Sequence, residues 1–446
     1  MNGRIINALF GEQRKEQIFR AASLLFFLSL WFWKGAVLLR DSGGFIDGRI
    51  IRSPLYPLII NIFSFLDDSL KLLVLFQLLL GLFAVHHLLI TLKKIFNFGY
   101  ITSVILFLFL TLPYYFITLN QKLLIGNSVM SGAVCYPLFL LAIWAVFRAI
   151  IHKQMRYYIY FILISTLLVL TRRQFLFLYP FFIILWLSLF LQKGITDFSK
   201  WHLIIIFILS IITADLLERT YQYVKFNEFS NTPFTGRQVL VLPMFVAEKD
   251  DVGLFEDQQQ RDIFRYVYRE MADKEITFRD KGFNFLNLYR TYEQHYNQIS
   301  HHVIPPAAEE VLGEQYTEHR MDDATVQISL TLIKHHFMNF IKLYLKNIEV
   351  NIGNKSIASF LVLLFILGLI YYIKTRSELA LIILLSLILQ FGNYMLIAAA
   401  EPIIWRYTFY TNQIFYSVLA LAAVYGPGKQ NTAEKGVSND EESSML

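Results

Sequence analysis

Residues 69–92, SLKLLVLFQLLLGLFAVHHLLITL, form the stretch that decides the fold of this chain. A helix needs about 20 mainly apolar residues to cross the hydrocarbon core of a bilayer, and this stretch is long enough. Similar runs recur through the 446 residues, 56% of which are hydrophobic and only 17% charged. A soluble protein normally carries about 25% charged residues. The composition therefore predicts an all-α polytopic membrane protein.

Apolar runs of this kind predict about ten transmembrane helices. In chain order they cover residues 18–37, 69–92, 101–119, 131–149, 157–171, 174–192, 202–221, 357–373, 379–399 and 407–425. The stretch 157–192 also fits a single kinked element that dips into the membrane, because Arg172 and Arg173 interrupt it.

Lysines and arginines gather in short segments between the apolar runs, and this pattern sets the expected orientation. Such clusters stay on the cytoplasmic side, so we expect both ends of the chain there. The net charge of +6 therefore reflects topology, and we exclude nucleic acid as a partner. Cys135 is the only cysteine, which excludes an intrachain disulfide. The frequent Phe, Ile and Lys and the lack of a cysteine framework favour a bacterial inner (plasma) membrane.

The same topology divides the chain into four expected parts. They are an N-terminal transmembrane module (1–221) with a first external loop (38–68), an extracytoplasmic helical region (222–355), C-terminal transmembrane helices (356–425) and a disordered cytoplasmic tail (426–446). In the first loop, Pro54 and Pro57 open a short apolar helix that is expected to lie in the interface. The amphipathic pattern in the extracytoplasmic region predicts a small helical lobe.

Charged side chains at the outer ends of the spans are the candidates for chemistry. The first loop carries the carboxylates of Asp41 and Asp47, and the flexible Gly43 and Gly44 lie between them. Basic residues also come out on this side: Arg40, Arg49, Arg52, Lys122, Arg172, Arg173 and Arg406. Arginine at membrane depth is costly unless it is paired or solvated, and its guanidinium binds phosphate oxygens in a bidentate manner. An anionic head group is thus the expected ligand. The alternatives are an ordinary charged loop, phospholipid anchoring, or ion pairs with Asp41, Asp47 and Glu401.

The histidines of the external region do not predict a metal site. None of them shows the HExxH spacing or a similar ligand pattern: His295, His301, His302, His319, His335 and His336. His335 and His336 lie in an amphipathic, lysine-rich run, where a polar interfacial face is the expected explanation. The sequence names no certain cofactor and does not indicate a divalent cation.

The first loop resembles that of GT-C fold integral membrane glycosyltransferases, of the aminoarabinose and mannosyl transferase type. A first span that ends in an aspartate is followed by R-x-P-x-Y-P at the start of a short apolar helix. These residues are Asp41, Ser42, Arg52, Pro54, Tyr56 and Pro57. Some members carry an Asp-Glu pair here, and many have an acidic residue in the second outer loop, where this chain has Gly126-Asn127-Ser128. The run LTRRQFLFLYP (170–180), the long external section and the Arg406-Tyr407 pair fit the same arrangement.

The resemblance implies a GT-C-like helical bundle that transfers a sugar from a polyprenyl-phosphate donor, with inversion, on the extracytoplasmic face. Asp41 would be the general base, with Asp47 as the alternative acid or base. The donor phosphate would be held by Arg52, Lys122, Arg172, Arg173 and Arg406. Ser42, Tyr56 and Tyr407 would support the loop and the substrate. The expected partners are the lipid-linked donor, membrane lipids, and a lipid, glycan or protein acceptor.

Two other functions remain open from the sequence. An O-antigen ligase or polymerase would use a diphosphate-linked glycan, and it would also need outward-facing arginines. A transporter or flippase for an anionic lipid would need ionisable residues deep in the membrane. Asp215, with Glu218 and Arg219 close by, is the nearest candidate for such a site, and no inverted repeat accompanies it.

Overall fold

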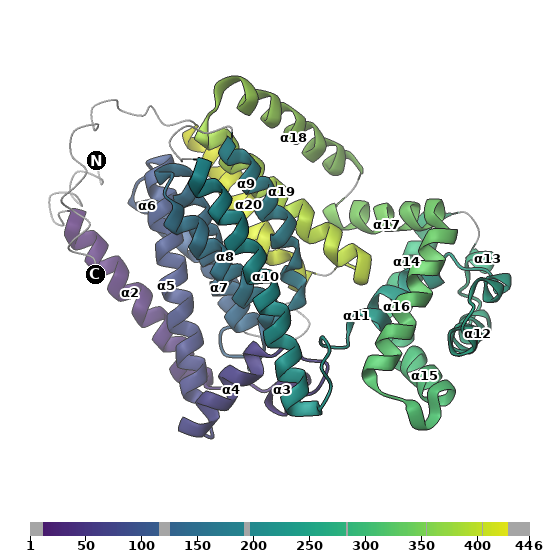
Figure 1. Cartoon of the computed structure of the whole chain (residues 1–446). Coiled ribbons are helices and arrows are strands. Elements are labelled where there is room, and N and C mark those ends of the chain that lie inside the picture. Colours follow the sequence, from purple (N-terminus) through teal and green to yellow (C-terminus); the bar gives the residue numbers. More distant parts are fainter. Residues whose placement is uncertain are drawn as a thin grey trace.

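The computed structural model describes residues 12–115, 125–190, 197–281, 284–353, 355–403 and 405–426. Within these ranges the chain is all-α, and its only β-type contact is a bridge between Val37 and Ser128. Figure 1 shows a bundle of long helices and, at its right, a lobe of shorter ones.

Every predicted span falls on a helix of the bundle. The helices are α2 (Glu12–Lys34), α5 (Lys71–Phe96), α6 (Tyr100–Tyr115), α7 (Gly132–His152), α8 (Met155–Thr171), α9 (Leu178–Phe190), α10 (Asp197–Phe226), α18 (Lys355–Thr375), α19 (Glu378–Ala400) and α20 (Trp405–Tyr425). In the described ranges, six segments are long and apolar enough to cross a membrane: α5, α7, α10, α18, α19, and α9 with the turn before it. These six segments indicate an integral membrane protein.

The structure does not test the remaining four predicted spans as membrane crossings. Helices α6 and α8 are apolar but shorter, and α2 and α20 are not among the six segments. The number of spans, about ten, therefore stays a prediction. The side of the membrane on which each end of the chain lies also stays a prediction.

The stretch 157–192 is broken at Arg172, as its charge pattern predicted. Helix α8 ends at Thr171, Arg172 is extended with φ −163° and ψ 120°, and a 3-10 turn, η1 (Arg173–Phe177), leads into α9. The first loop holds α3 (Ser42–Ile46) and α4 (Leu55–Leu66). Pro54 caps α4, which confirms the short helix predicted there.

The lobe is built from the helices between α10 and α18. They are α11 (Thr235–Met244), α12 (Gln258–Ala272), α13 (Phe278–Lys281), α14 (Phe285–Gln298), α15 (Ile304–Leu312), α16 (Glu318–His335) and α17 (Phe337–Ile352), with the short turns η2 (Lys249–Leu254), η3 (Ile299–Val303) and η4 (Gly313–Gln315). The lobe has its own hydrophobic core, centred on residues such as Phe264, Tyr292 and Ile328. Helices α11 and α17 both pack on α19, so the lobe is joined to the bundle there.

Candidate functional site between the bundle and the lobe

Asp41 lies at the start of α3 and faces Arg52 from the same loop. The Arg52 Nη2 atom is 3.7 Å from Asp41 Oδ1, and the Asp41 side chain is 46% exposed. This is a loose ion pair, so the carboxylate remains accessible. The Arg52 Nε atom is buried and has no hydrogen-bond partner in the described part of the chain. An unpaired guanidinium N–H beside an accessible carboxylate is a suitable place for an anionic, hydroxyl-bearing ligand.

A stack of rings holds Arg52 in place. Its guanidinium lies over the Phe45 ring at 4.4 Å, and Phe45 packs edge-on against the buried Tyr56 at 5.3 Å. The Tyr56 hydroxyl accepts a hydrogen bond of 2.9 Å from Gln77 on α5. A Cβ atom at Gly44 would lie 3.1 Å from Arg52 Nε, so the glycine makes room for the arginine. Tyr56 thus joins the first loop to α5 through Gln77, and the role that the resemblance implies for it stays a prediction.

The backbone before Asp41 is also fixed. The buried Asn127 side chain donates to the carbonyls of Leu30 at 2.9 Å and Gly35 at 3.0 Å. Ser42 Oγ accepts from the Leu39 amide at 2.8 Å. Asn127 therefore has a bracing role that the sequence did not reveal, because the bond joins segments far apart in the chain.

A second set of charges lies where α19 gives way to α20. Two guanidiniums lie over the Tyr407 ring, with Arg172 4.4 Å and Arg406 4.7 Å from its centroid. Arg406 Nη2 also donates to the Tyr407 hydroxyl at 2.6 Å. The Tyr407 carbonyl accepts from Gln174 at 2.7 Å and from Asn393 at 2.9 Å, which fixes the start of α20.

Glu401 follows the last residue of α19 and hydrogen-bonds Tyr407 through its carboxylate. Burial raises the pKa of Glu401 to about 7, although Arg406 and Arg172 act in the opposite direction. Asn347 of α17 braces this turn by donating to the Glu401 carbonyl at 3.1 Å. The sequence offered Glu401 only as an ion-pair partner. The contact with Asn347 comes from the lobe helix α17, which no local pattern predicts.

The lobe contributes a further arginine. Arg237 of α11 is buried and lies 4.2 Å over the Phe234 ring, and its Nε atom has no hydrogen-bond partner in the described part of the chain. Partial burial of His301 is the main cause that lowers its pKa. The charge of Arg237 lowers this pKa further, and the charge of Asp41 raises it. Arg237 and His301 therefore lie near the first loop. The sequence analysis missed Arg237 because nothing around it marks it as different from other lobe residues.

Arg52 is within electrostatic range of both sets of charges. Burial is the main cause that lowers the pKa of Arg52. The charges of Arg172 and Arg237 lower this pKa further, while those of Asp41 and Tyr407 raise it. Arginines from the first loop, the α8–η1 junction and the lobe are therefore close enough for their charges to act on one another, and Arg406 contacts Tyr407. Such a group of arginines is suited to binding a phosphate group.

Other candidates lie elsewhere or are engaged. Arg173 Nη2 is 3.1 Å from the buried Glu218 carboxylate, so this pair ties η1 to α10. Asp47 is exposed and 3.9 Å from Arg49. Asp215, the residue nearest to what a transporter would need, pairs with Arg219 at 2.7 Å. Lys122 lies outside the described residues.

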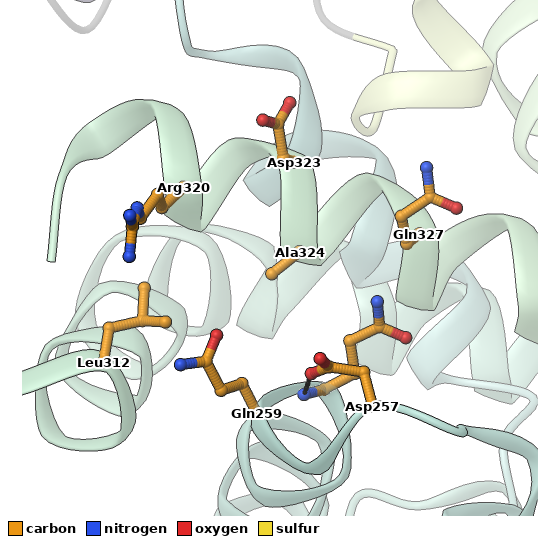
Figure 2. Close-up of a pocket in the computed structure, with 8 residues that line it drawn as sticks. Asp257, Gln259, Leu312, Arg320, Asp323, Ala324 and Gln327 are labelled. Carbon is orange, nitrogen blue, oxygen red and sulfur yellow. Dashed lines mark hydrogen bonds between the residues drawn. The ribbon is translucent and has the colours of Figure 1, made fainter. Parts of the chain in front are cut away.

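The lobe also has a surface hollow, which Figure 2 shows between α12 and α16. Its polar groups already serve the local structure. Asp257 Oδ1 caps α12 by accepting from the Gln260 amide at 2.9 Å, and Arg320 donates to Gln315 at 2.7 Å. We place no chemistry in this hollow.

Comparisons with protein-family models, with curated proteins and with solved structures return no match. The resemblance to GT-C glycosyltransferases therefore remains a prediction from the residues of the first loop.

Proposed function

We propose that this protein is an inverting glycosyltransferase that moves a sugar from a polyprenyl-phosphate donor to an acceptor hydroxyl at the membrane surface. The observation that carries the proposal is the accessible Asp41 carboxylate beside Arg52, whose pKa is lowered by burial and by the nearby charges of Arg172 and Arg237. A carboxylate and a phosphate-binding cluster are the two groups that this reaction needs.

The residues divide the reaction between them. Asp41 takes the proton from the acceptor hydroxyl as its oxygen attacks the anomeric carbon. The bond between that carbon and the phosphate oxygen breaks, and the sugar is inverted in a single displacement. Polyprenyl phosphate leaves with added negative charge, which Arg52, Arg172 and Arg406 stabilise. The prenyl chain stays in the hydrocarbon throughout, which suits a site at the ends of the bundle helices.

The proposal includes a topology. With about ten spans and both termini in the cytoplasm, the site faces the periplasm or exterior of a bacterial inner membrane. The distribution of Lys and Arg in the short loops supports this orientation. Lipid, glycan and protein acceptors all fit an open site of this kind.

The decisive experiment compares donors. Purified protein in vesicles is given short-chain polyprenyl-phosphate sugars or the corresponding diphosphate-linked glycans, and product formation is followed by mass spectrometry. We expect transfer from the monophosphate donors and release of polyprenyl phosphate. Transfer from the diphosphate donors alone would replace the proposal with a ligase or polymerase, and movement of donor lipid across the bilayer without transfer would replace it with a flippase.

A further inference from the structure

The junction of α16 and α17 in the lobe brings two histidines to a buried carboxylate. His336 Nε2 is 2.7 Å from Asp251 Oδ2, and His335 Nε2 is 3.9 Å from Asp251 Oδ1. The potential ligand atoms of the three residues all lie within 4.8 Å of one another. This cluster is separate from the site between the bundle and the lobe, and the proposed function does not use it.

A break in the helix explains why neighbouring histidines converge. On a continuous α-helix, successive side chains point about 100° apart, since the helix has 3.6 residues per turn. His336 leaves the helical conformation, with φ −104° and ψ 31°, so α16 ends at His335 and α17 starts at Phe337. The two imidazole rings are therefore only 4.8 Å apart and nearly perpendicular, at 85°.

The carboxylate is held ready by its own turn. Asp251 lies in η2 and its side chain is only 6% exposed. The Glu248 amide donates to Asp251 Oδ2 at 2.7 Å as part of a capping box. Oδ1, the oxygen nearer to His335, is left for a further ligand. A hydrogen bond from a neighbouring amide to a carboxylate that binds a metal fixes the orientation of that carboxylate.

We propose that Asp251, His335 and His336 bind one divalent transition-metal ion, with zinc as the ion that suits them best. Two imidazole nitrogens and one carboxylate oxygen are a common zinc ligand set, and they leave a fourth position for water. In a tetrahedral site, neighbouring ligand atoms lie about 3.3 Å apart, so His336 and Asp251 separate slightly when the ion enters. His335 is 52% exposed, which gives the ion a route from solvent.

The ion would tie η2 to the start of α17. That helix carries Asn347, which donates to the carbonyls of Ala398 and Glu401. The metal site therefore has a structural role in the lobe and lies at one end of the helix that braces the Glu401 turn. Without a metal, His336 only hydrogen-bonds the Asp251 carboxylate, at 2.7 Å.

Cobalt titration of the full chain distinguishes these two states. The protein is purified in detergent, treated with EDTA and titrated with Co²⁺, whose visible absorption reports coordination by protein ligands. We expect saturation at one equivalent and loss of the signal when Zn²⁺ is added. His335→Ala and Asp251→Asn should each weaken binding about tenfold or more, since each removes one ligand.

The controls separate ligand loss from misfolding. His335→Ala removes a half-exposed side chain, so its melting temperature without metal should match that of the unaltered protein. His302→Ala removes an exposed histidine of η3 and should leave cobalt binding unchanged. Zn²⁺ should raise the melting temperature of the unaltered protein but not that of His335→Ala. Absence of saturable cobalt binding, or equal binding by the unaltered protein and His335→Ala, would overturn the proposal.

Discussion

The two sides of the candidate site each combine a carboxylate with arginines, but in different environments. On the first-loop side, Asp41 is nearly half exposed and 3.7 Å from Arg52. On the α19–α20 side, burial raises the pKa of Glu401 to about 7, and the residue hydrogen-bonds Tyr407. An exposed carboxylate can receive a proton from an incoming substrate, whereas a carboxylate whose pKa is raised by partial burial mainly sets the position and charge of its neighbours. We therefore assign proton transfer to Asp41 and positioning to Glu401.

Replacing Asp41 is expected to have the largest effect. Asp41→Asn keeps the size of the side chain but removes the base, and general-base catalysis is typically worth about 10²–10⁴-fold in rate. Transfer activity should fall by that factor with an unchanged melting temperature. Asp47→Asn is the matched control in the same loop and should retain activity. A fully active Asp41→Asn variant would remove the difference between the two sides of the site.

Neighbouring arginines offer the next test. Arg172→Gln should lower transfer by about 10²-fold, as expected for the loss of one group that stabilises developing charge. Arg173→Gln should instead destabilise the fold by about 3 kcal/mol, because it leaves the buried Glu218 carboxylate without its partner. Activity assays and melting curves on both variants check the assignment. The opposite pattern would place Arg173 in the site and Arg172 in the scaffold.

A smaller effect is expected at Gly44. Gly44→Ala places a Cβ atom 3.1 Å from Arg52 Nε and should displace the guanidinium by a few tenths of an ångström. A shift of that size should lower transfer by about tenfold, mainly through a higher KM for the donor. Gly43→Ala is the control, because a Cβ atom there meets nothing within 4 Å. Equal activity of the two variants would show that Arg52 does not hold the donor.

Among these variants, Glu401→Gln should change transfer activity least. Its main effect should be a change in folding stability that depends on pH. Glu401 binds its proton more tightly in the folded protein than in the unfolded chain, where its pKa is near 4.5. Ionising it in the folded state costs free energy, so this group lowers stability progressively as pH rises from about 4.5 to about 7. Glu401→Gln should therefore be more stable than the unaltered protein at pH 8, by about 3 kcal/mol, and equally stable near pH 4. Melting curves at both pH values measure the difference. Loss of transfer as complete as in Asp41→Asn would move the base role to Glu401.

The sequence predicted the parts of this structure that depend on local patterns. Long apolar runs became helices, Pro54 capped the short helix α4, and the charges at Arg172 and Arg173 marked the break between α8 and α9. The sequence placed Asp41 and Arg52 in the same loop, and the structure brings them to 3.7 Å of each other, because only a short segment separates them.

Contacts between distant segments were not predictable in the same way. Arg237 reaches the site only because the lobe packs against the bundle, and Asn127 braces the first loop across a long separation in sequence. The two histidines of the proposed metal site seemed to belong to an amphipathic helix. They converge on Asp251 because the helix breaks between them, which the hydrophobic pattern does not reveal.

The most direct test of the central claim is mass spectrometry of cell-envelope glycolipids and glycans. Three strains are compared: one with the gene, one without it, and one that carries the Asp41→Asn variant at equal protein abundance. We predict a glycan or glycolipid that carries one additional sugar in the first strain only, with accumulation of the polyprenyl-phosphate sugar in the other two. Identical envelope profiles in the three strains would contradict the account.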